Sequence, residues 1–184
     1  MQSRVLYESP QPRTGRRDCS FAVFLLGIAK WRTINSQRAT METAAIAEVL
    51  GGPKALGRSI KKPNDLAQLV REGLPAISVT ALAQRLYLGT NAVSRILGIP
   101  QRTLTRRLSE GSLLTSAESD RTVRLARVYA NAVEMLGERE KAVEWLGTAN
   151  RALGGEKPLD LLDTDTGSRM VEDILGRIAY GVYS

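Results

Sequence analysis

Apolar residues at helical spacing, in runs that end at glycine or proline, constrain the fold of this 184-residue chain more than any other feature. From residue 42 onward they recur three and four positions apart, which is the period of an amphipathic helix. A glycine or proline after each run ends one helix and lets the chain turn before the next. No segment carries strand signals of consequence, so the sequence predicts an all-α fold.

The pattern places helices over residues 42–50, 63–73, 78–88, 91–97, 101–108, 115–136, 138–146 and 166–178. Thr115 and Glu118 have the spacing of a capping box, which opens a helix by reciprocal hydrogen bonds. Gly176 lies inside the last helix, where glycine is unfavourable, and this makes a close neighbour plausible there. The apolar faces fit ordinary core better than a ligand pocket. That core is predicted to include Ala45, Ile46, Val49, Leu50, Leu82, Ala83, Leu86, Tyr87, Leu104, Leu108, Met170, Val171, Ile174, Leu175 and Ile178.

Residues 91–111 have the pattern of a helix-turn-helix. Two short helical segments are separated by Gly98, Ile99 and Pro100. Gly98 gives the turn its backbone freedom, and Ile99 is expected to insert into the core between the helices. The pattern alone does not specify DNA binding, because helix pairs joined through glycine also occur in proteins that contact no DNA.

The second of these helices is expected to present its charge on one face. Leu104 and Leu108 lie one turn apart and should face inward. At about 100° per residue, Arg102 and Arg106 then point outward. No Asp or Glu occurs from residue 96 to residue 109. Such a face suits the major groove of DNA, although a solvated basic surface would have the same composition.

On the DNA interpretation, Arg102 and Arg106 can each donate two hydrogen bonds to guanine, while Arg95 and Arg107 are placed to meet phosphates. The candidate DNA-binding residues are Arg95, Gln101, Arg102, Thr103, Thr105, Arg106 and Arg107. A single short helix contacts few bases, which implies a homodimer on a two-fold operator site.

The composition argues against an enzyme. The chain has no histidine, which excludes Ser–His and Cys–His nucleophile pairs, imidazole bases and histidine-containing metal sites. Neither G-x-x-x-x-G-K-[ST] nor G-x-G-x-x-G is present. Asp160, Asp163 and Asp165 could pair as catalytic carboxylates, but turn and helix-start acids near a positive helix N-terminus explain them better. We expect no catalytic residue, no cofactor and no metal.

The net charge of +7 lies mostly in residues 1–40, which hold seven Lys or Arg and two Asp or Glu. Their apolar run, residues 21–29, is too short to span a bilayer and lacks the form of a secretory signal. We expect residues 1–40 to be a poorly ordered basic extension, from an upstream start codon, with Met41 as the functional start. The single Cys19 fits a reducing compartment, so a cytoplasmic protein without a membrane partner is expected.

Residues 145–184 carry a more specific pattern. It consists of Trp145, Leu146, Asn150, Leu153, Gly154, Gly155, Pro158, Leu159, Asp160, Leu161, Leu162, Thr166, Gly167, Val171, Leu175 and Gly181. In this spacing the chain resembles the toxin-binding domain of Xre/MbcA/ParS-type antitoxins, which are paired with RES-domain toxins. A weaker resemblance extends back to about Met41. Ala149 departs from the pattern, since the family often has proline there, but this only removes a backbone constraint in a loop.

The resemblance implies an Xre-like helix-turn-helix domain over residues 41–136 and a toxin-binding domain over residues 137–184. It implies a type II antitoxin that neutralises a RES-type toxin, an NAD-consuming or ADP-ribosylating enzyme, and represses its own operon. The implied toxin-binding residues are Arg169, Glu172, Asp173, Arg177, Tyr180, Gly181, Val182, Tyr183 and Ser184. The main alternative is a free-standing helix-turn-helix regulator whose C-terminal domain binds a ligand or another partner.

The last five residues have chemistry that suits a plug for an enzyme cleft. Tyr180 and Tyr183 offer large rigid contacts, and the carboxylate of Ser184 could pair with groups that bind a dinucleotide diphosphate. The alternative is a frayed terminus that happens to be apolar.

Overall fold

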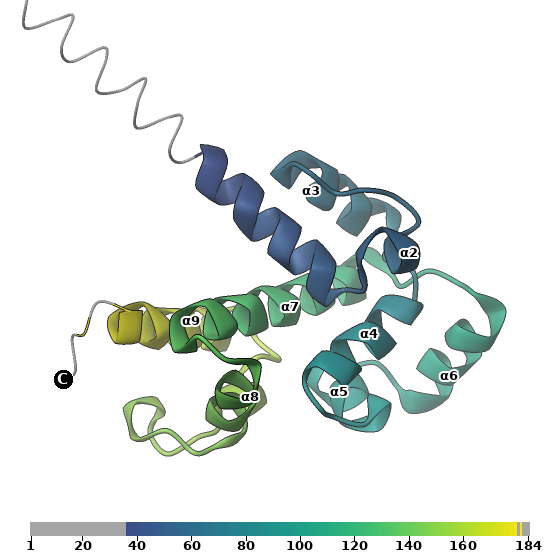
Figure 1. Ribbon diagram of the computed structural model, residues 1–184. Helices are drawn as coiled ribbons and strands as arrows, with labels where there is room; N and C mark the ends of the chain where they lie inside the picture. The colour runs from purple at the N-terminus through teal and green to yellow at the C-terminus, as the bar shows by residue number, and fades with distance from the viewer. Residues whose placement is uncertain (1–35, 180, 182–184) are drawn as a thin grey trace, which may run out of the picture. The chain divides into compact units, whose positions relative to one another are not determined.

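The computed structural model describes residues 36–179 and residue 181 (Figure 1). The chain divides into two units, residues 1–37 and residues 38–184. Of the first unit, only Ser36 and Gln37 belong to the described residues. A helix over residues 36–49 comes first. It is followed by α2 (Gly52–Leu56), α3 (Pro63–Glu72), α4 (Ile77–Arg85), α5 (Thr90–Ile96), α6 (Gln101–Glu110), α7 (Ser116–Leu136), α8 (Arg139–Gly147), the 3-10 turns η1 (Arg151–Leu153) and η2 (Pro158–Leu161), and α9 (Asp165–Ala179). The described residues contain no strand and one isolated β-bridge, between Pro75 and Leu113. The all-α prediction is therefore confirmed.

Helix α7 connects the two halves of the chain. It begins at the predicted capping box, where the Thr115 hydroxyl accepts the Glu118 N–H at 3.3 Å and the Glu118 carboxylate accepts the Thr115 N–H at 2.7 Å. Along its 21 residues α7 packs against α3, α8 and α9 (Figure 1). Helix α7 therefore joins the helices that precede it to α8 and α9.

Most of the predicted core is buried, with three exceptions: Ala45, Tyr87 and Met170 are exposed. Tyr87, 66% exposed, follows the end of α4 at a φ of 52°, so helical spacing no longer governs its direction. Met170, 44% exposed, lies at the edge of the apolar stripe of α9 and not at its centre. Ala45 lies beside the buried face of its helix, which Ile46 and Leu50 form.

Two glycines of α9 have opposite surroundings. At Gly167 a Cβ atom would lie 2.0 Å from the carbonyl oxygen of Leu161, so only glycine lets the start of the helix approach that turn. The Thr164 hydroxyl caps this start by accepting the Gly167 N–H at 3.0 Å. The close neighbour suggested for Gly176 is not there, because nothing lies within 4 Å of a Cβ atom built at that residue.

The first described helix begins earlier than the sequence predicted. Residues 36–40 are helical, and the Thr43 hydroxyl donates to the carbonyl oxygen of Ala39 at 2.7 Å within it. The rest of the predicted extension, residues 1–35 with the apolar run, lies outside the described residues. Within the described part, no helix is both long and apolar enough to cross a membrane.

Candidate functional site

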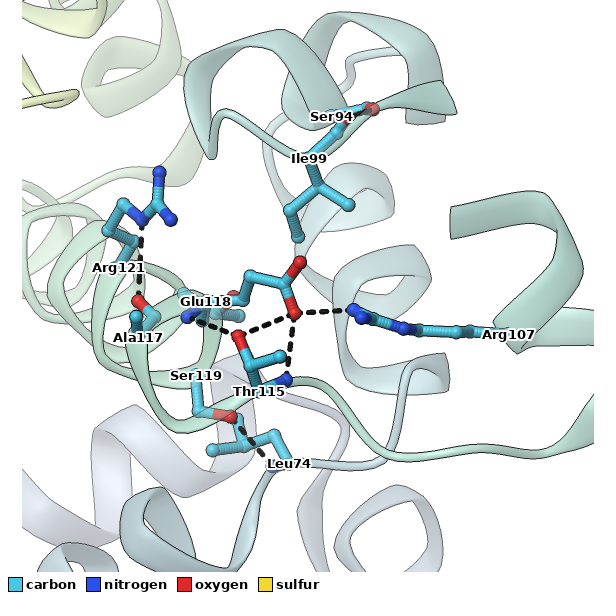
Figure 2. Close-up of polar contacts among 10 residues, drawn as sticks. Leu74, Ser94, Ile99, Arg107, Thr115, Ala117, Glu118, Ser119 and Arg121 are labelled. Atoms are coloured by element: carbon cyan, nitrogen blue, oxygen red, sulfur yellow. Dashed lines mark hydrogen bonds and ion pairs between the residues drawn. The ribbon is translucent and has the colours of Figure 1, made fainter. Parts of the chain in front are cut away.

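Helices α5 and α6 are joined by the predicted tight turn. Gly98 has a φ of 63° and donates its N–H to the carbonyl oxygen of Arg95 at 3.0 Å. Ile99 is buried as expected, and its N–H donates to the Ser94 carbonyl at 2.9 Å. The Ser94 hydroxyl donates back to the Ile99 carbonyl (Figure 2). These reciprocal bonds satisfy the backbone of the turn and fix the angle between the two helices.

The outer face of α6 is basic and open to solvent. Leu104 is buried and Leu108 packs half-buried against the core, whereas Arg102 and Arg106 are exposed. The inward and outward sides of α6 are therefore as the sequence predicted. A surface hollow of about 720 Å³ follows this face, lined by Arg102, Thr103, Thr105, Arg106 and Ser109.

Two further candidates lie at the margins of this face. Arg95 is exposed in the last turn of α5. The side-chain amide of Gln101 donates to the Asn91 side chain of α5, so it ties the start of α6 to the preceding helix. Gln101 is exposed, which leaves its position at the N-terminus of α6 compatible with a contact to DNA.

Arg107 does not lie where the sequence placed it. Its guanidinium is paired with the carboxylate of Glu118 at the start of α7, and the two side chains are only 15% and 12% exposed (Figure 2). Arg107 follows Leu104 by three residues and so lies beside the buried face of α6. The expected phosphate contact is therefore wrong. No local sequence pattern indicates this pair, because its acid lies in another helix, where the spacing predicts only a capping box.

The carboxylate of Glu118 is stabilised in its charged form. Burial by itself would raise the pKa of Glu118, but hydrogen bonds from the Thr115 N–H and hydroxyl and from Arg107 outweigh that effect. The pKa of Glu118 is consequently below its ordinary value. The Arg107–Glu118 ion pair thus persists at neutral pH.

The C-terminal candidates lie along the outer side of α9. Arg169, Asp173 and Arg177 are exposed, and Arg169 is paired with Asp165 at 3.0 Å. Glu172 is half-buried; burial raises its pKa, with the positive charge of Arg127 opposing that shift. Gly181 forms a turn at a φ of 67° and ends the helix as predicted. The other four predicted contacts, Tyr180, Val182, Tyr183 and Ser184, lie outside the described residues.

A cavity that the sequence did not predict lies where the first described helix meets α7 and α9. Its volume is about 520 Å³. Its lining includes Met41, Glu42, Glu134, Glu172 and Leu175. Because these residues come from three distant segments, no local pattern could have indicated the cavity.

The fold and its exposed surfaces define a helix-turn-helix protein with a C-terminal helical domain. Two family models match the helix-turn-helix part and the C-terminal part of the chain. Residues 65–127 match the antitoxin Xre-like helix-turn-helix domain, and residues 131–181 match the antitoxin Xre/MbcA/ParS C-terminal toxin-binding domain. The first match ends and the second begins within α7, so this helix is shared by both domains.

Individual relatives agree with these matches. Antitoxin Xre of Yersinia enterocolitica is 35% identical over 129 residues, which cover 61% of this chain and 87% of the relative. Antitoxin Xre of Pseudomonas putida is 32% identical over 157 residues, covering 79% and 98%. The Prs ADP-ribosylating antitoxin of a Sphingobium species is 27% identical over 140 residues, covering 71% and 87%. The chain therefore belongs to the Xre-type antitoxin family.

Proposed function

We propose that this chain is the antitoxin of a type II toxin–antitoxin system and that it neutralises a RES-type toxin by binding it. The observation that carries this proposal is the match of residues 131–181 to a toxin-binding domain. The name of the Sphingobium relative, which contains the term ADP-ribosylating, favours a toxin with that chemistry. We infer that the chain acts by binding and not by catalysis, without a cofactor.

The toxin contact is proposed to include the outer side of α9 and the chain end that follows it. Exposed charges of both signs on α9, from Arg169, Asp173 and Arg177, can pair with a complementary toxin surface. Glu172 is proposed as a further contact at the margin of this surface. Residues Tyr180 to Ser184 are proposed to enter the toxin's active-site cleft, where the rings of Tyr180 and Tyr183 would provide large rigid contacts.

The second part of the proposal is repression of the antitoxin's own operon. Arg102 and Arg106 are proposed to contact base edges, with Gln101, Thr103 and Thr105 beside them and Arg95 on a phosphate. The exposure of this acid-free face supports that assignment. A homodimer on a two-fold operator is proposed because one short helix contacts few bases.

Co-expression tests the proposal. The chain should restore growth to cells that express the RES-domain protein encoded beside its gene, and it should co-purify with that protein. Removal of residues 180–184 should abolish rescue while binding to the promoter fragment remains. Equal rescue by the shortened chain would remove the tail from the mechanism. The absence of any toxic neighbour, with promoter binding intact, would favour the free-standing regulator instead.

A further inference from the structure

We infer that Glu118 is a positioning residue for sequence-specific DNA binding. Through Arg107 it fixes the orientation of α6 against α7, and so it determines where the outer face of α6 points. The inference rests on the proposed binding of DNA by α6. It assigns to Glu118 a role in DNA selectivity that neither its place in a capping box nor the family match indicates.

The carboxylate is a fixed anchor even without Arg107. One oxygen, Oε2, accepts the Thr115 N–H at 2.7 Å and the Thr115 hydroxyl at 2.8 Å, and the same oxygen receives the Arg107 guanidinium (Figure 2). The Glu118 carbonyl in turn accepts the Thr122 hydroxyl at 2.8 Å. Because Glu118 belongs to the first turn of α7, a helix of 21 residues that packs against several others, this anchor moves only with the body of the domain.

Arg107 is fixed at its backbone as well as at its side chain. It lies in the last turn of α6, and its carbonyl accepts the Ser112 N–H at 2.9 Å and also the N–H of the cap residue Gly111. The remaining support of α6 comes from α5 and from the buried Leu104 and half-buried Leu108. The start of α6 is also tied to α5 by the Gln101–Asn91 hydrogen bond and by the Ser94–Ile99 bonds of the turn, so the Arg107–Glu118 pair is the charged, directional contact near its other end.

Rotation of α6 would affect base contacts and phosphate contacts differently. A bidentate hydrogen bond from Arg102 or Arg106 to guanine requires a defined position and angle. Attraction to phosphates is long-ranged and tolerates such a shift. In addition, neutralising Glu118 removes one negative charge from a domain that approaches DNA, which by itself strengthens non-specific binding. Neutralising Glu118 should therefore lower affinity for the operator but not affinity for random DNA.

The test compares Glu118→Gln with Asp120→Asn by fluorescence anisotropy, at one fixed salt concentration, on the promoter fragment and on random DNA. Glutamine retains an acceptor oxygen and is itself a capping-box residue, so the start of α7 is preserved. Asp120→Asn removes the same charge from the same helix but breaks the exposed pair with Arg124, at 2.6 Å, which does not involve α6. Arg107→Gln breaks the same ion pair at its other partner, so the test does not depend on normal folding of Glu118→Gln alone.

We expect Glu118→Gln and Arg107→Gln to lower the ratio of promoter affinity to random-DNA affinity at least about fivefold, the lower end of the discrimination carried by one bidentate contact. Asp120→Asn should leave that ratio unchanged. The inference is overturned if both anchor variants keep the wild-type ratio, if their affinities for the two DNAs fall in parallel, or if Asp120→Asn lowers the ratio equally. A wild type that does not prefer its promoter would refute the proposed DNA binding itself, and this inference with it.

Discussion

Leu175 and Met170 lie on the same helix, and truncation of each to alanine should have very different effects. Leu175 is 2% exposed and Met170 is 44% exposed. Leu175→Ala removes three carbons from the core, about 2.4 kcal/mol at roughly 0.8 kcal/mol for each buried methylene group. With the cavity left behind, the total loss for a buried leucine truncated to alanine is about 2 to 5 kcal/mol. Met170→Ala should cost about 1 kcal/mol or less, as an exposed substitution does.

Urea unfolding monitored by circular dichroism measures both free energies of unfolding. Leucine and methionine have nearly equal helix propensities, so the change to alanine affects helix formation equally in the two variants. For a protein of this size the Leu175 loss corresponds to a fall in Tm of about 4 to 20 °C. Equal losses in the two variants would refute the assignment of the buried face of α9. Leu175→Asp, which buries an unpaired carboxylate, should unfold the C-terminal domain and abolish toxin neutralisation.

Three further predictions follow from individual contacts. Gly167→Ala should destabilise the fold by about 1 to 3 kcal/mol in urea unfolding, because its Cβ would meet the Leu161 carbonyl, whereas Gly176→Ala should stabilise it by about 0.5 to 1 kcal/mol. Arg102→Ala with Arg106→Ala should abolish the gel shift of the promoter fragment, at about 1 to 3 kcal/mol for each lost base contact, while toxin neutralisation remains; an unchanged shift would contradict the base-contact assignment. The lowered pKa of Glu118 adds stability that is complete above its ordinary value of 4.5 and is lost as pH falls through the lowered folded-state value. The stability difference between wild type and Glu118→Gln should therefore shrink as pH falls below the ordinary value of 4.5, and a constant difference would contradict the shift.

Local patterns predicted what depends on neighbours in the sequence. The helix starts at Pro63 and Thr115, the turn at Gly98 and the outward direction of Arg102 all follow from capping, backbone freedom and helical period. The same period failed at Tyr87, where the chain had already left α4. Periodicity describes a residue only while the helix continues.

Contacts between distant elements could not be predicted in this way. Helical spacing places Arg107 and Glu118 beside the buried faces of their own helices, but only the fold, which brings the end of α6 to the start of α7, pairs them with each other. Gly167 was recognised as part of a family pattern, but its physical reason, the carbonyl of Leu161, appears only in the folded chain. The cavity beside α9 has the same origin, since its lining comes from three segments.

The central claim is tested most directly by the growth of cells that express the proposed partner, a RES-domain protein encoded beside this gene, with and without this chain. The toxin alone should arrest growth. Co-expression of the full chain should restore it, and a variant that ends at residue 136, and so lacks most of the matched toxin-binding region, should not. The account is contradicted if the full chain gives no protection at an expression level at which it is soluble, or if the chain that ends at residue 136 protects as well as the full chain does.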